Sequence, residues 1–70
     1  MAIDWDKVEG LAVQGEAAWR SLVDDIRLYR VGRTSGLALS TTQKGAILAR
    51  LKASRDELIL TLETLKAEVA

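Results

Sequence analysis

The chain has 70 residues, no cysteine and no histidine, and its ten basic residues balance its ten acidic ones, so the formal net charge is zero. This length allows one small domain, residues 1–70, and the composition excludes disulfides, thiolate chemistry and the usual zinc sites. Apolar residues make up 49% and charged residues 29%, which is typical of a folded chain. A core of this size is marginal by itself, so we expect self-association or docking onto a larger partner.

No stretch of the sequence predicts contact with a membrane. The first ten residues, MAIDWDKVEG, have neither the basic nor the apolar region of a signal peptide. The longest nearly apolar run, Leu58 to Leu62, is far too short to span a bilayer. We therefore expect a cytoplasmic protein without a membrane partner.

The first predicted helix covers about residues 4–31. Asp4 is a suitable N-cap, and Gly32 is a suitable residue for the left-handed position after the last turn. Apolar or small residues recur between them at alternating steps of three and four, which predicts a helical contact seam. The seam consists of Trp5, Val8, Ala12, Gly15, Trp19, Leu22, Ile26 and Tyr29. We expect Trp5, Val8, Trp19, Leu22 and Ile26 to lie in the core.

The connection, residues 31–40, is compatible with two conformations. In one, it is a loop with Leu37 and Leu39 tucked over the end of the helices. In the other, it is a short β-hairpin in which roughly Leu28–Val31 pairs with Leu37–Ser40 across a turn at residues 33–36. A two-stranded hairpin is marginal alone, so it would have to pack on the helices or on a partner.

The second predicted helix covers about residues 41–69. Ser40 and Gln43 match the S-x-x-Q capping box. The helix then carries a stripe of Ile47, Leu51, Ser54, Leu58, Leu62, Leu65 and Val69. We expect the core contribution of this helix to be Leu51, Leu58, Leu62 and Leu65.

A short connection between two such helices predicts an all-α fold, an antiparallel two-helix hairpin. Facing residues should then have numbers that sum to about 71, which places Ser54 near Trp19 and Gly45 opposite Ile26. Gly10 and Gly15 each destabilise a helix by about 1 kcal/mol relative to alanine. Close packing of another backbone or a large ring against them would explain their presence.

Several apolar residues lie off the two seams and form a candidate apolar interaction surface. They are Leu11, Val23, Ile59 and Leu60, with Val13 beside them. One interpretation is scattered surface residues, which are common. The other, which we favour, is a second buried face made by self-association or by a larger host.

Charge is distributed unevenly along the chain. Residues 20–55 hold eight basic residues against two acidic ones, a net charge of +6, whereas residues 1–19 and 56–70 each carry −3. A hairpin would therefore be basic at the loop end and acidic at the open end. We treat the basic tip as a second candidate interaction surface, formed by Arg27, Arg30, Arg33, Lys44 and Arg50. Its alternatives are ordinary solvated charge, an acidic protein partner and nucleic-acid phosphates.

The sequence lacks recognisable catalytic chemistry. The adjacent carboxylates Asp24–Asp25 and Asp56–Glu57 diverge on a helix, and GRTSG lacks the pattern of a phosphate-binding loop. We therefore expect no enzymatic activity, cofactor, metal or small-molecule substrate. Nucleic acid is the weaker partner, because the isoelectric point is 6.2 and no aromatic residue outside the seam accompanies the arginines.

The order of features between about Leu22 and Leu65 resembles the gpW-type head-completion proteins of tailed phages. The matching segments are RLYRVGRTSG and the following LALSTTQKGAILARL. The resemblance implies an α-ββ-α protein that assembles in a ring between head and tail, and hence a virion location. The first helix is longer here than in that family, and no site residue can be transferred.

Three functional hypotheses follow from the sequence. The leading one is a protein–protein interaction module, a homo-oligomer or a subunit of a larger assembly such as a phage head–tail connector. The second is a small inhibitor or regulator, an antitoxin or a phage-encoded blocker of a host protein. The third is a nucleic-acid-binding accessory protein.

Overall fold

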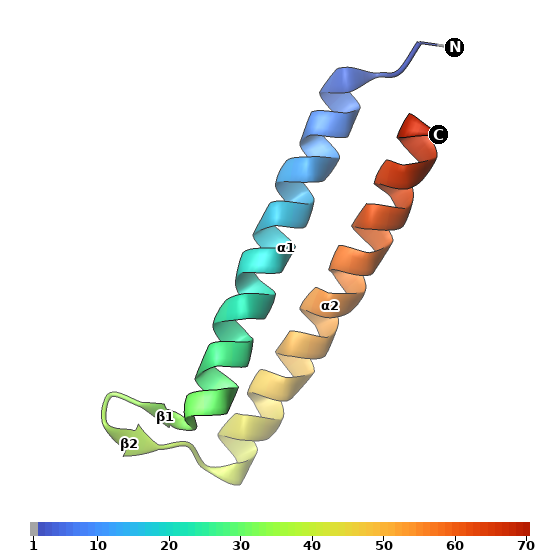
Figure 1. Cartoon of the computed structure of the whole chain (residues 1–70). Helices are drawn as coiled ribbons and strands as arrows, with labels where there is room; N and C mark the ends of the chain where they lie inside the picture. Colours follow the sequence, from blue (N-terminus) through green and yellow to red (C-terminus); the bar gives the residue numbers. More distant parts are fainter. Residues whose placement is uncertain (1) are drawn as a thin grey trace.

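The computed structural model describes residues 2–70 and contains two long helices joined by a short pair of strands. The order is α1 (Trp5–Val31), β1 (Arg33–Thr34), β2 (Leu37–Ala38) and α2 (Thr41–Val69). The helices lie side by side and run in opposite directions, with both termini at the end away from the strands (Figure 1). The molecule is elongated, with extents of 54 × 17 × 12 Å. The predicted antiparallel helical hairpin is confirmed.

Both ends of α1 follow from local sequence signals. The Asp4 carboxylate accepts a hydrogen bond of 3.2 Å from the backbone N–H of Lys7, as a helix N-cap does. At the other end, Gly32 adopts φ 71° and donates its N–H to the Leu28 carbonyl at 2.9 Å. This left-handed conformation is readily available to glycine, so the helix stops where the sequence predicts.

The connection forms a β-hairpin and not an open loop. Arg33 pairs with Ala38 and Thr34 with Leu37 in antiparallel register. The two residues between the strands, Ser35 and Gly36, both have positive φ, at 51° and 77°. Two consecutive positive φ values are typical of the type I′ turn, whose twist matches that of the paired strands.

The β-hairpin is shorter than predicted and lies in a different position. Residues 28–31 remain in α1, so the strands begin only at Arg33. The Leu39 N–H donates to the Gly32 carbonyl at 2.9 Å, and the Leu39 side chain is buried. Leu37 was expected to cover the helix ends in the loop conformation, but its side chain is exposed. Leu39 is therefore the only one of the two leucines that closes the end of the hairpin.

A complete capping box starts α2. The Ser40 hydroxyl accepts from the Gln43 N–H at 3.1 Å, and the Gln43 side chain accepts from the Ser40 N–H at 2.8 Å. Two backbone donors that have no partner within the helix are thereby satisfied. The predicted start of the second helix is confirmed.

The most deeply buried positions between the two helices are mostly small or polar. The buried residues of the helices are Gly15, Ala18, Leu22, Asp25, Ile47, Ser54 and Thr61. A Cβ added to Gly15 would lie 3.6 Å from Cγ2 of Thr61, which is ordinary van der Waals contact. At Gly15 the two helices are therefore in ordinary van der Waals contact through short side chains.

Four of the nine residues predicted for the core lie outside it in this chain. Leu22 is buried as expected, and the half-buried members are Val8, Leu51, Leu58 and Leu65. By contrast, the side chains of Trp5, Trp19, Ile26 and Leu62 are exposed. The prediction was wrong because the contact line on α1 passes through the neighbouring positions Ala18 and Asp25, and on α2 through Thr61. Side chains as large as tryptophan would hold the helices further apart.

The register between the helices also differs from the prediction. Ser54 donates a hydrogen bond of 3.3 Å to the hydroxyl of Ser21 and so lies opposite Ser21, not opposite Trp19. A Cβ added at Gly10 or at Gly45 would contact nothing within 4 Å, so the expected close packing at Gly10 is wrong. Of the two glycines discussed for α1, only Gly15 lies in the helix contact.

Candidate interaction surfaces

Polar contacts between the helices lie along one edge of the hairpin, which we call the polar edge. Asp25 is buried, and its carboxylate accepts from Nη2 of Arg50 at 2.7 Å and from Nε at 3.0 Å. Ser21 and Ser54 pair beside it, and near the open end Lys7 Nζ lies 2.6 Å from Glu68 Oε1. Three residues of α1, namely Lys7, Ser21 and Asp25, thus make polar side-chain contacts with α2.

The Asp25–Arg50 pair explains how a carboxylate can be buried in so small a protein. Both carboxylate oxygens receive hydrogen bonds from the guanidinium, and such two-point, charge-assisted contacts are strong and directional. The hydrogen bond with Asp25 and the attraction of its charge raise the pKa of Arg50 above its ordinary value. The pair fixes the register of the helices, since a lone buried charge would be costly.

The opposite edge of the hairpin is rich in exposed apolar side chains. On a helix, each residue is rotated by about 100° from the one before it. Trp19 directly follows the buried Ala18, whereas Ser21 directly precedes the buried Leu22. Trp19 and Ser21 therefore lie on opposite sides of the contact line.

The same rule places exposed residues of α2 on the side of Trp19. Leu62 follows the buried Thr61, and Ile59 follows the half-buried Leu58. In an antiparallel pair, the residues that come directly after a contact-line residue in the sequence lie on the same side of the hairpin in both helices. We call this surface the apolar face; its exposed apolar members are Trp5, Trp19, Ile26, Ile59, Leu62 and Val69. The same rule places two exposed basic residues on it, Arg55 after the buried Ser54 and Lys66 after the half-buried Leu65.

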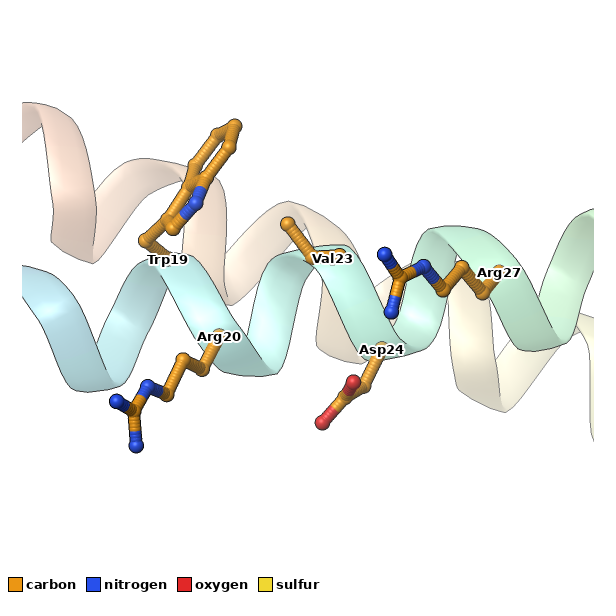
Figure 2. Close-up of a pocket in the computed structure, with 5 residues that line it drawn as sticks. All are labelled: Trp19, Arg20, Val23, Asp24 and Arg27. Atoms are coloured by element: carbon orange, nitrogen blue, oxygen red, sulfur yellow. The ribbon is translucent and has the colours of Figure 1, made fainter.

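The apolar face differs in part from the surface predicted off the seams. Ile59 belongs to it, and Val23 is half-buried on the same side of α1, where Figure 2 shows it pointing in the direction of Trp19. Leu11 is half-buried along the contact line. Leu60 is 64% exposed and lies on the outer side of α2, away from the face. The larger part of the face comes from residues that the sequence assigned to the core.

A shallow hollow of about 210 Å³ lies on α1 beside the apolar face. It is lined by Trp19, Arg20, Val23, Asp24 and Arg27, and in Figure 2 Trp19 and Val23 point to one side while Arg20 and Asp24 point to the other. The hollow marks the border between the apolar and the charged surface of the helix. Its shallowness suits a side chain of another protein better than an enclosed small molecule.

The predicted basic tip is present at the loop end, with one change. Arg27, Arg30, Arg33 and Lys44 are exposed in or next to the last turns of α1, β1 and the first turn of α2. Arg50 instead directs its guanidinium to Asp25, so part of its charge is neutralised within the hairpin.

Lys44 has a position that the sequence did not indicate. A Cβ added to Gly32 would lie 3.8 Å from Cε and 3.9 Å from Nζ of Lys44, so the ammonium sits at the end of α1. There it faces the negative end of the α1 dipole, which is favourable. The sequence placed Lys44 only against the dipole of its own helix, because the register across the hairpin was not known.

Among residues 2–70, no group of three or more acidic, histidine or cysteine side chains could hold a metal ion. Within the same part of the chain, no helix is both long and apolar enough to cross a membrane. The apolar face and the basic tip are the two candidate interaction surfaces of the described residues.

No protein-family model matches the chain, and neither a curated protein nor a solved structure is significantly similar to it.

Proposed function

We propose that the chain is a non-enzymatic protein–protein interaction module that works as a small structural subunit of a larger assembly. The observation that carries the proposal is the apolar face on an otherwise folded hairpin. Trp5 is 65% exposed and Trp19 is 54% exposed. Tryptophan is among the residues most enriched at protein interfaces, so two exposed tryptophans on one face indicate a contact surface. An exposed surface rich in large apolar side chains, with charged side chains among and around them, is typical of a contact site.

The basic tip provides a second contact of a different kind. Its exposed cations extend from the end of the hairpin, where they can meet an acidic surface of another subunit. Charges at the border of an interface mainly accelerate association and select the partner. Replacing Arg30, Arg33 and Lys44 by glutamine should therefore leave helicity intact, slow association and reduce its dependence on salt.

A more specific form of the proposal is a connector subunit of a tailed-phage particle. It is supported by the element order, α1-β1-β2-α2, which is the order expected from the resemblance to gpW-type proteins. The test is the protein content of purified virions. The chain should be present in fixed copy number per particle, and its absence from virions would exclude this form while leaving the general one intact.

Sedimentation of the chain in extract from its native cells tests the general proposal. The chain should move in a complex heavier than any small oligomer of the 7.7 kDa chain, together with partner subunits in fixed ratio. Equal sedimentation in extract and after purification would refute an assembly subunit. A complex with a single host protein at fixed stoichiometry would instead support the inhibitor hypothesis.

A further inference from the structure

The single hairpin exposes more surface than a compact protein of its mass. The accessible surface is 5423 Å² for a chain of 7.7 kDa. A compact monomer of this mass exposes about 4,300 Å². The radius of gyration is 15.8 Å, against about 11 Å for a compact chain of this length.

The excess, about 1,100 Å², has the size of a protein interface. Stable interfaces bury about 800 Å² on each partner, and obligate dimers bury more. The hairpin therefore has enough surplus surface for one interface of ordinary size or slightly larger. The polar edge is occupied by contacts within the chain, which leaves the apolar face as the place for it.

We infer that the apolar face binds the same face of a second copy, so that two hairpins form a four-helix bundle with their loops at opposite ends. This inference names the partner of the apolar face and so rests on the proposed function. A two-fold symmetric contact needs a surface complementary to itself. Two features of the chain meet that requirement, its charge distribution and the sizes of residues along α1.

Charge decides the orientation of the two copies. Residues 20–55, around the loop end, carry +6, and the two segments at the open end carry −3 each. With the loops at opposite ends, the basic half of each copy lies along the acidic half of the other. With the loops together, the two +6 segments would face each other and repel.

Residue size supports the same arrangement. The two-fold axis has to cross near the middle of the hairpin, close to Trp19 of α1. Symmetry then places residues equally far before and after Trp19 opposite each other in the two copies. Ala12 and Ile26 are both seven residues away, so each Ile26 meets an alanine of the second copy. Large side chains then face small ones on both sides of a central pair of Trp19 rings, as close packing requires.

The test combines two matched variants with sedimentation equilibrium of the purified full chain. The unmodified chain should have twice the 7.7 kDa mass at micromolar concentration. Trp19→Glu introduces a charge at the proposed axis and should weaken dimerisation at least about 30-fold, as the loss of a central anchor does. Leu60→Glu introduces the same charge on an exposed apolar residue outside the face, 64% exposed against 54% for Trp19, and should leave the dimer intact.

Orientation needs a second measurement, which does not depend on how Trp19→Glu folds. Because the chain has no cysteine, Thr34→Cys gives one spin-label site in β1, at the loop end of the hairpin. Loops at opposite ends predict a separation between labels close to the 54 Å length of the molecule. A separation comparable with its 17 Å width would place the loops together and overturn the inference.

A monomer at every concentration would also overturn the inference, as would a dimer that Leu60→Glu disrupts and Trp19→Glu does not. These outcomes are distinct from failure of the proposed function. A purified monomer that still enters a heavy complex in native extract refutes the second copy alone. A purified dimer that sediments in extract as the same dimer refutes the larger assembly alone.

Discussion

Leu22→Ala is the perturbation that tests the helix contact line most sharply. Leu22 is 8% exposed, so nearly all of the removed side chain leaves a buried environment. Leucine-to-alanine changes in cores reduce the free energy of unfolding by 2–5 kcal/mol, depending on how far the site collapses. A two-helix contact is open at its edges and can partly close, so we expect a loss of about 2–3 kcal/mol. A chain of this size has a total stability of about 3.5–10 kcal/mol, so the loss should be a large fraction of it.

Urea unfolding followed by circular dichroism, at one fixed protein concentration, measures this loss as a shift in the midpoint. Val13→Ala is the matched control, because Val13 lies on the same helix but is 60% exposed. Surface changes of that kind stay within about 0.5 kcal/mol. If Leu22→Ala were as mild as Val13→Ala, the contact line along Gly15, Ala18 and Leu22 would be misplaced.

Three further predictions follow from the caps, the contact line and the ion pair at the open end. Ser40→Ala removes the side-chain acceptor of the capping box and should lower the free energy of unfolding by about 1 kcal/mol in the same urea assay. Gly15→Ala should raise it by up to about 1 kcal/mol, because the added Cβ meets Thr61 at an ordinary 3.6 Å and glycine is a poor helix former; a loss instead would mean that the helices are closer than described. The hydrogen bond to Glu68 raises the pKa of Lys7 above its ordinary 10.5. The pair therefore contributes fully below pH 10.5, and its contribution is lost as the pH rises through the higher value of the folded state. The difference in urea midpoint between the unmodified chain and Lys7→Gln should shrink above that pH, and an unchanged difference would exclude the pair.

Local features of the fold could be predicted from the sequence because they depend on a few neighbouring residues. Asp4, Gly32 and the Ser40–Gln43 pair each act within one turn of a helix end, and all are found where the sequence indicates. The turn is also a local feature, but the sequence left a loop and a β-hairpin open and placed the hairpin turn at residues 33–36, whereas the turn residues with positive φ are Ser35 and Gly36.

The choice of contact line could not be made from periodicity alone. Two neighbouring seams on the first helix both have steps of three and four, one through Trp19 and Ile26 and the other through Ala18 and Asp25. Reasoning from hydrophobicity selected the first. The structure contains the second, because short side chains allow close approach and Arg50 satisfies the buried Asp25 carboxylate. In the sequence, only one signal pointed to this line: a basic residue, Arg50, at the position of the second helix that faces Asp25.

The seam that does not lie between the two helices of the hairpin forms part of the apolar face. Trp5, Ala12, Trp19 and Ile26 follow one another at intervals of seven residues, and this regularity is as strong as that of the buried line. A helix with two adjacent seams can bury the side chains of one seam within the hairpin and those of the other against a partner. Which of the two seams packs within the hairpin depends on the tertiary structure. The spacing of residues along the sequence does not reveal it.

The dependence of thermal stability on protein concentration tests the central claim, that the hairpin is completed by association through its apolar face. Because association that favours the folded state stabilises it by mass action, the melting temperature should rise steadily as the chain is made more concentrated. The same series with Trp19→Glu should be flat, while Leu60→Glu should retain the rise. A melting temperature of the unmodified chain that is independent of concentration, from well below to well above micromolar, would contradict the account.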